Sequence, residues 1–386
     1  MGPVGDVFSE LIGQERVVAT LRRAVAGAAH AMTHAWLFVG PPGSGRSNAA
    51  RAFAAALQCE RGGCGQCEAC RTTVSGAHPD VTLVRTEQLS IGVDEVRAMV
   101  GRANVAPVGR RHQIVVVEDA DRMTERAADA LLKGLEEPSP RTVWLLCAPT
   151  PEDVIVTIRS RCRLARLVTP SPGAVAALLV ERDGIDPGHA AQAARIAQGH
   201  VGRARALARS DEANRRRREI LAIPPRLRTL TDCLAAAQSQ VEATAAEASE
   251  ITAPLDAKEM AALQEALGIG GRGTKPRNAQ AAVRELEDQH KLRLKRLQRD
   301  ALDRVLTELT AYFRDVLVLQ TRAGAALINA DLADEIAQLS NRSTPEHTIQ
   351  AIDALLEART ALEGNVAPLL ALEAMFIAVS RAVRAR

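Results

Sequence analysis

Four cysteines crowd into one short segment, as Cys59-x4-Cys64-x2-Cys67-x2-Cys70. Thiolates at this spacing can meet at one tetrahedral metal centre, and the glycines between them permit tight turns. A centre closed by four sulfurs has no open position for catalysis, so the spacing predicts a structural Zn²⁺ site. An iron–sulfur cluster is the alternative, because C-x2-C-x2-C also occurs in ferredoxins. The proline and the second cluster motif of ferredoxins do not follow here, which favours zinc.

A second chemical motif is the segment GPPGSGRS, which fits the phosphate-loop pattern G-x4-G-K-[ST] except at Arg46. The glycines Gly40, Gly43 and Gly45 would let backbone N–H groups wrap phosphates at a helix N-terminus. Ser47 stands where the pattern needs a hydroxyl for Mg²⁺. Arg46 keeps the positive charge of the usual lysine, but its planar fork does not replace a compact ammonium. The pattern predicts a phosphate-loop fold and leaves open whether the loop holds ATP.

An acidic pair, Glu118-Asp119, follows the β-branched run at 114–117. A working ATPase of this type places Asp first, to hold Mg²⁺, and Glu second, to polarise the attacking water. The order is reversed here, so the two carboxylates would have to exchange roles despite their different reach. We therefore do not expect this chain to hydrolyse ATP at its own site.

Short apolar runs alternate with helical patterns in the first 169 residues. The predicted strands are 35–39, 81–84, 114–117 and 143–147, and the predicted helices between and around them are 14–29, 47–57, 93–102 and 127–135. This alternation predicts an α/β domain over 1–169, with a parallel sheet and helices on both faces, and with the cysteine module 59–70 inserted.

Only helices are predicted beyond this point. Three short ones (171–181, 189–198 and 203–209) indicate a small helical domain over 170–210, and long ones fill 211–386. Charged helical stretches flank a Gly-rich segment at 268–276, which predicts a helical arm inserted around 242–300.

Composition limits the function. The 386 residues carry 49 Lys+Arg against 46 Asp+Glu, a net charge of +3, which is too balanced to coat nucleic acid by charge alone. Apolar residues make up 47% of the chain, which excludes wholesale disorder, and aromatic residues make up 2%, which argues against base-stacking platforms. No apolar run approaches a membrane span and the N-terminus has no signal-peptide pattern, so we expect a cytoplasmic protein.

The order of these motifs resembles one family. The segments that carry the resemblance are 8–14 (FSELIGQ), 34–38 (HAWLF), the phosphate loop, the cysteine module, 91–97 (IGVDEVR), 130–138 (ALLKGLEEP), Ser160-Arg161-Cys162 and 365–373 (NVAPLLALE). Together they resemble the delta-prime subunits of the bacterial DNA polymerase III clamp loader. The resemblance implies an AAA+ domain, a three-helix lid and a helical collar. It also implies a five-subunit ring with gamma/tau and delta subunits, which places the sliding clamp on primed DNA during replication.

The resemblance assigns roles to particular residues. Arg161, within Ser160-Arg161-Cys162, would be an arginine finger that reaches the ATP and Mg²⁺ held by a neighbouring subunit. The ATP-hydrolysing sister subunits carry a Thr where this chain has Pro149, and a lid Arg where it has Gly202. Arg203 lies one position away from that lid position. These differences imply a non-catalytic subunit.

Two other functions stay open on the sequence. The first is an ATP-hydrolysing subunit of the gamma/tau type, which the Arg46 loop, the reversed acidic pair and Gly202 argue against. The second is a zinc-dependent nucleic-acid-binding module, which the cysteine cluster permits but the balanced charge does not favour. No residue suggests that the chain polymerises nucleotides, although the polymerase holoenzyme to which such subunits belong does so.

Overall fold

The computed structural model describes residues 6–86, 90–109, 111–267 and 279–384. The chain divides into two compact units, Met1–Arg209 and Ser210–Arg386, and each has its own apolar core. The Gly-rich segment at 268–276, predicted as the tip of the helical arm, lies outside the described residues.

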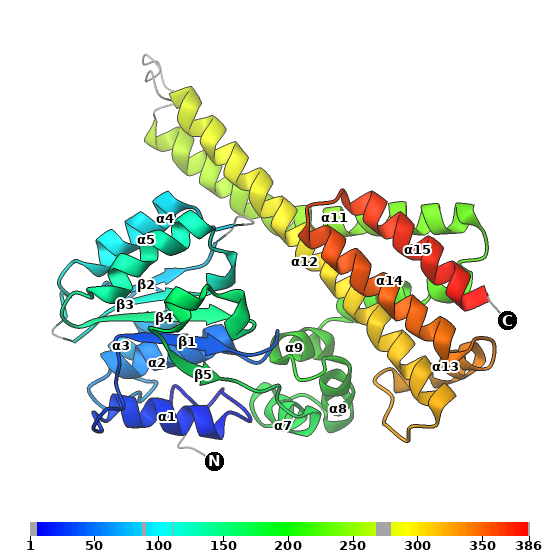
Figure 1. The fold of residues 1–386 in the computed structure, drawn as a ribbon, viewed down its shortest axis with the longest axis horizontal. Coiled ribbons are helices and arrows are strands. Elements are labelled where there is room, and N and C mark those ends of the chain that lie inside the picture. The colour runs from blue at the N-terminus through cyan, green and yellow to red at the C-terminus, as the bar shows by residue number, and fades with distance from the viewer. Residues whose placement is uncertain (1–5, 87–89, 110, 268–278, 385–386) are drawn as a thin grey trace. The chain divides into compact units, whose positions relative to one another are not determined.

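The first unit is built on a parallel sheet of five strands in the order β2-β3-β4-β1-β5 (Figure 1). The strands are β1 (Ala35–Val39), β2 (Val81–Val84), β3 (Gln113–Val117), β4 (Thr142–Ala148) and β5 (Arg163–Arg166). The predicted α/β fold class is confirmed. Four strands coincide with predicted ones to within a residue at each end, whereas β5 was not predicted.

The sequence of β5, RLAR, explains why it escaped prediction. It lies at the edge of the sheet and pairs only with β1 among the named strands, with Leu37 opposite Leu164. An edge strand needs fewer apolar residues than a central one, and Arg163 and Arg166 give it no continuous apolar run.

Helices cover both faces of this sheet. They are α1 (Glu15–Val25), α2 (Arg46–Gln58), α3 (Glu68–Ser75), α4 (Val93–Ala103), α5 (Glu125–Glu136) and the short α6 (Val156–Arg159). Alternate residues of each strand enter two separate cores, because successive strand side chains point to opposite faces. In β1, Trp36 and Phe38 pack with α1 and α2, while Leu37 packs with residues of α4 and α5.

Three helices complete the first unit after β5. They are α7 (Pro172–Asp183), α8 (Pro187–Ile196) and α9 (Val201–Arg209). Ser171 begins α7 by accepting a hydrogen bond from the N–H of Ala174, and Pro172 occupies the first turn. Asp186 caps α8 in the same way, through the N–H groups of Gly188 and His189.

The second unit is entirely helical among its described residues. Its helices are α10 (Asp211–Leu221), α11 (Leu230–Ala266), α12 (Ala279–Thr321), α13 (Ala333–Ser340), α14 (Pro345–Glu363) and α15 (Pro368–Arg384). The two longest, α11 and α12, run side by side as a hairpin (Figure 1). The N-terminal part of α11 and the C-terminal part of α12 pack with α14 and α15 around one apolar core.

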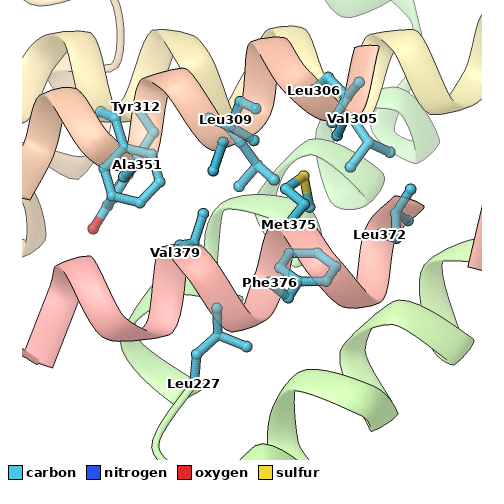
Figure 2. Close-up of a cluster of buried hydrophobic side chains, with 14 of the residues drawn as sticks. Leu227, Val305, Leu306, Leu309, Tyr312, Ala351, Leu372, Met375, Phe376 and Val379 are labelled. Carbon is cyan, nitrogen blue, oxygen red and sulfur yellow. The ribbon is translucent and has the colours of Figure 1, made fainter. Parts of the chain in front are cut away.

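Figure 2 shows this core. Leu306 and Leu309 of α12 face Met375 and Phe376 of α15, and all four side chains are buried. A buried apolar set of this kind, contributed by helices far apart in the sequence, fixes how the second unit packs. Among the described residues, no helix is both long and apolar enough to cross a membrane.

Candidate functional site

The phosphate-loop segment connects β1 to α2, as its sequence predicts. Gly43 and Gly45 have φ angles of +83° and +89°, which favour glycine. A Cβ added to Gly43 would lie 2.6 Å from side-chain atoms of His200 and 2.8 Å from its Cα. Gly43 therefore packs closely against the residue that precedes α9 and leaves no room for a side chain. Gly45 is favoured by its backbone angle alone.

Arg46 is the first residue of α2, and its guanidinium turns back onto the loop. Its Nη1 donates a hydrogen bond to the carbonyl oxygen of Gly40. The positive charge that replaces the usual lysine is thus engaged by a backbone oxygen of the same loop. This contact gives Arg46 a structural partner inside the chain.

A cavity of about 240 Å³ adjoins the loop. It is lined by the loop and the start of α2 (Gly43–Asn48), by residues 10–12, and by Pro170, Leu178, His200, Val201, Gly202 and Arg205. The Ser44 hydroxyl is buried and has no hydrogen-bond partner among the described residues. Burial lowers the pKa of His200, and the charge of Arg203 lowers it further, so the ring is neutral at physiological pH.

Arg205 is a lining residue that sequence reasoning did not single out. Its Nε lies 2.8 Å from Oδ2 of Asp183, so this cation is paired within the unit. The sequence spacing could have indicated this residue, because Arg205 follows Gly202 by three residues and so lies on the same side of α9.

The acidic pair follows β3, and its first member is already engaged. Oε1 of Glu118 accepts a hydrogen bond from Nε of Arg51 in α2 at 2.8 Å, and the Glu118 side chain is only 8% exposed. Asp119 comes next, two residues after β3 ends and just before a 3₁₀ turn at Ala120–Arg122. A buried carboxylate paired with an arginine is poorly placed to activate a water, because the pair stabilises its charge where it lies.

The four predicted metal-ligand cysteines come together at the other end of α2. Cys59 ends that helix, and all four sulfurs lie within 4.8 Å of one another. Sγ of Cys59 is 3.7 Å from that of Cys64 and 3.6 Å from that of Cys67. Tetrahedral Zn²⁺ with Zn–S bonds of about 2.3 Å separates its sulfurs by about 3.8 Å. The donor set therefore fits a structural metal such as zinc.

Backbone N–H groups favour the thiolate form of two of these thiols, Cys59 and Cys64, whereas burial raises the pKa of Cys70. Burial raises the pKa of Cys59, but the N–H groups of Cys64, Gly63 and Arg61 outweigh it and lower the pKa to about 6. The N–H of Cys70 points to Sγ of Cys67 at 3.4 Å. Hydrogen bonds donated to sulfur stabilise negative charge there, as in other thiolate metal sites.

Arg161 lies just beyond α6 and does not line the loop cavity. Its Nη1 donates to the carbonyl oxygen of Thr157 at 2.7 Å and to Oγ of Ser160 at 3.2 Å. Its Nη2 lies 2.6 Å from Oε1 of Glu136, the last residue of α5. The Arg161 side chain is 37% exposed, so it is accessible to an external anion.

A second group of metal-ligand types, Asp256, Glu259 and His290, lies between α11 and α12. Arg293 occupies its carboxylates, at 2.7 Å from Oδ1 of Asp256 and 3.0 Å from Oε2 of Glu259. These residues form an ion-pair network that joins the two helices.

Comparisons with known proteins agree with this arrangement. The family model described as "DNA polymerase III, delta subunit" matches residues 13–171, and the one described as "DNA polymerase III, delta subunit, C terminal" matches residues 288–380. DNA polymerase III subunit delta' of Pseudomonas aeruginosa is 43% identical over 152 residues, which is 38% of this chain and 45% of that one. The delta' subunit of Bacillus subtilis is 33% identical over 193 residues, 49% and 58% of the two chains.

The chain is also similar to gamma/tau subunits of DNA polymerase III. DNA polymerase III subunit gamma/tau of Mycobacterium tuberculosis is 37% identical over 186 residues, which covers 46% of this chain and 32% of that one. The matched region spans between about a third and three fifths of the length of these relatives.

A five-stranded parallel sheet with a phosphate-type loop after β1, followed by helical segments, defines the class as an AAA+ protein related to clamp-loader subunits. Within that class, the chain belongs to the DNA polymerase III delta subunit family, of the delta' type. The resemblance inferred from the sequence is confirmed.

Proposed function

We propose that this chain is a non-catalytic subunit of a DNA polymerase III clamp loader. In this role it joins gamma/tau-type and delta-type subunits in a ring and helps to place the sliding clamp on primed DNA. Its own phosphate loop does not turn over ATP. It supplies Arg161 to the ATP and Mg²⁺ of a neighbouring subunit instead.

The observation that carries the proposal is the difference between two arginines. Arg46, at the phosphate position, is engaged by the Gly40 carbonyl inside its own loop. Arg161 extends from a surface turn with over a third of its side chain exposed. Both arginines have partners within the chain, but Arg46 is only partly exposed, whereas Arg161 is exposed and can reach an anion on another molecule.

Other groups at the loop also support a nucleotide site that does not hydrolyse ATP. Glu118 is paired with Arg51, and Gly202 offers the cavity no cation at the position where the sister subunits carry an arginine. The remaining hydroxyl ligand, Ser47, lines the cavity without a lysine beside it. A gamma/tau-type ATPase would need these groups free to act on a nucleotide.

We propose Zn²⁺ as the metal of the cysteine cluster, with a structural role. The four thiols Cys59, Cys64, Cys67 and Cys70 would hold it between the end of α2 and the start of α3. The ion would supply a cross-link that fixes this insertion on the first unit.

The experiment that tests the proposal replaces Arg161→Ala in a loader reconstituted with its gamma/tau-type and delta-type partners. Arginine fingers accelerate phosphoryl transfer by about 10³- to 10⁵-fold, so the ATP turnover rate should fall by a factor in this range at the one site that Arg161 faces. The measurement is the rate of DNA-stimulated ATP hydrolysis. The total rate should fall by the fraction that this one site contributes.

Arg159→Ala is the matched control. Arg159 is the last residue of α6, two positions before Arg161; its side chain has the same 37% exposure and also pairs with a glutamate, Glu152. Loss of turnover with Arg161→Ala but not with Arg159→Ala supports the finger. Unchanged turnover with Arg161→Ala, in a loader that assembles normally, contradicts it.

A further inference from the structure

Arg161 is held by a carboxylate whose own position is fixed by the core. Glu136 is the last residue of α5, next to Leu135, which is 1% exposed. Ile158 of α6, three residues before Arg161, is also 1% exposed and belongs to the same apolar core as Leu135. The two elements that carry the acid and the base are therefore anchored to each other beneath the ion pair.

The contacts of Arg161 within this chain restrain its guanidinium but do not occupy all of its N–H donors. A guanidinium has five N–H donors. Three acceptors on this chain engage it: the Thr157 carbonyl, Oγ of Ser160 and Oε1 of Glu136. Within the part of the chain that the structure describes, two N–H groups therefore stay available, enough for a bidentate contact with an oxyanion.

Exposure sets the strength of this restraint. The side chains of Arg161 and Glu136 are 37% and 48% exposed, so solvent screens their attraction. A pair of this kind narrows the range of rotamers of a long side chain, yet it yields to a polyanion that offers more charge. This combination suits an arginine that must already be oriented when a phosphate arrives.

We infer that Glu136 is a positioning residue for Arg161, orienting the guanidinium toward the γ-phosphate of a nucleotide bound by the neighbouring subunit. The inference rests on the proposed function of Arg161 and adds a residue to it. Glu136 touches neither nucleotide nor Mg²⁺. It acts through the arginine by reducing the freedom that the side chain loses when it engages phosphate.

The test uses Glu136→Gln in the reconstituted loader, which removes the charge and keeps the size of the side chain. We expect kcat for DNA-stimulated ATP hydrolysis to fall about 2- to 5-fold at the site that Arg161 faces, with KM for ATP unchanged. Glu152→Gln, which breaks the analogous pair with Arg159, is the matched control and should leave kcat unchanged.

A double-mutant cycle separates positioning from a general structural effect. In the Arg161→Ala background, Glu136→Gln should cause no further loss, because there is no guanidinium left to orient. An equal loss in both backgrounds, or an unchanged or raised kcat with Glu136→Gln alone while Arg161→Ala is impaired, overturns the role of Glu136 only. If Arg161→Ala itself leaves turnover intact, the proposed finger fails, and the role of Glu136 fails with it.

Discussion

The two ends of helix α2 carry two chemical sites that differ in how complete they are. At the N-terminal end, the phosphate loop has Arg46 in place of lysine, and that arginine contacts the loop's own Gly40. At the C-terminal end, Cys59 begins a set of four sulfurs with the separations of a tetrahedral metal site. One end retains the shape of a nucleotide site, and the other retains a full ligand set.

The difference teaches that shape and chemistry can be retained separately. Gly43 of the loop still packs against His200, and Gln14 still donates to the carbonyl of Val168 at 2.6 Å beside the loop. These contacts hold the first unit together whether or not a nucleotide binds. Cys59 and Cys70 are also buried, but four thiols within 4.8 Å of one another have the arrangement of a ligand set.

The largest effect is expected at the cysteine end. Cys67→Ser should lower bound zinc to near zero and decrease the free energy of unfolding of the first unit by more than about 3 kcal/mol, because metal binding is coupled to folding. Both tryptophans, Trp36 and Trp144, are buried in this unit, so their fluorescence follows its unfolding in denaturant. Metal analysis gives the zinc content.

Cys162→Ser is the control for this change, since Cys162 lies outside the cluster. It should leave the zinc content intact. Full zinc retention by the Cys67→Ser protein would show that the ligand set is wrong and would remove the contrast between the two ends of α2.

An intermediate effect is expected at the loop. Gly43→Ala adds a Cβ at a φ of +83° and within 2.8 Å of the His200 backbone, so it should cost about 2–3 kcal/mol of unfolding free energy. Gly45→Ala is a matched comparison, because its φ is +89° but nothing lies within 4 Å of the added atom. It should cost about 1 kcal/mol, from backbone strain alone. Equal costs would mean that the loop does not pack on His200.

The smallest effect is expected for Arg46→Lys, which restores the lysine of the phosphate-loop pattern. Loss of the contact with Gly40 should change the unfolding free energy by about 1 kcal/mol or less. ATP turnover by the isolated subunit should stay absent, because Glu118 remains paired with Arg51. Measurable hydrolysis by this variant would show that Arg46 alone keeps the site silent.

Much of the first unit could be predicted from the sequence, because its central strands are continuous apolar runs. The run Ile114–Val117 and the strand at 35–39 are buried on both faces, and this pattern needs no tertiary information to recognise. The helix α3 and the strand β5 were missed. Both are short and polar, and they depend on neighbours: α3 on the cysteine cluster that begins it, and β5 on its pairing with β1.

The contacts of the site residues were less predictable. Motif spacing brought the four cysteines together correctly, since they are close in the sequence. It gave no sign that Glu136 would meet Arg161 or that Arg51 would meet Glu118, because these partners are 25 and 67 residues apart and depend on how α5, α6 and α2 pack. The resemblance supplied the proposed role of Arg161, and the structure supplied its surroundings.

The most direct test of the central claim is an ATP-turnover assay on the purified, isolated subunit, with labelled ATP and Mg²⁺ and with nucleotide binding measured in parallel. The account predicts no hydrolysis, whether or not the loop cavity binds nucleotide. Clear intrinsic turnover that is lost in a Ser47→Ala variant would contradict it. That result would place the chain among the ATP-hydrolysing subunits.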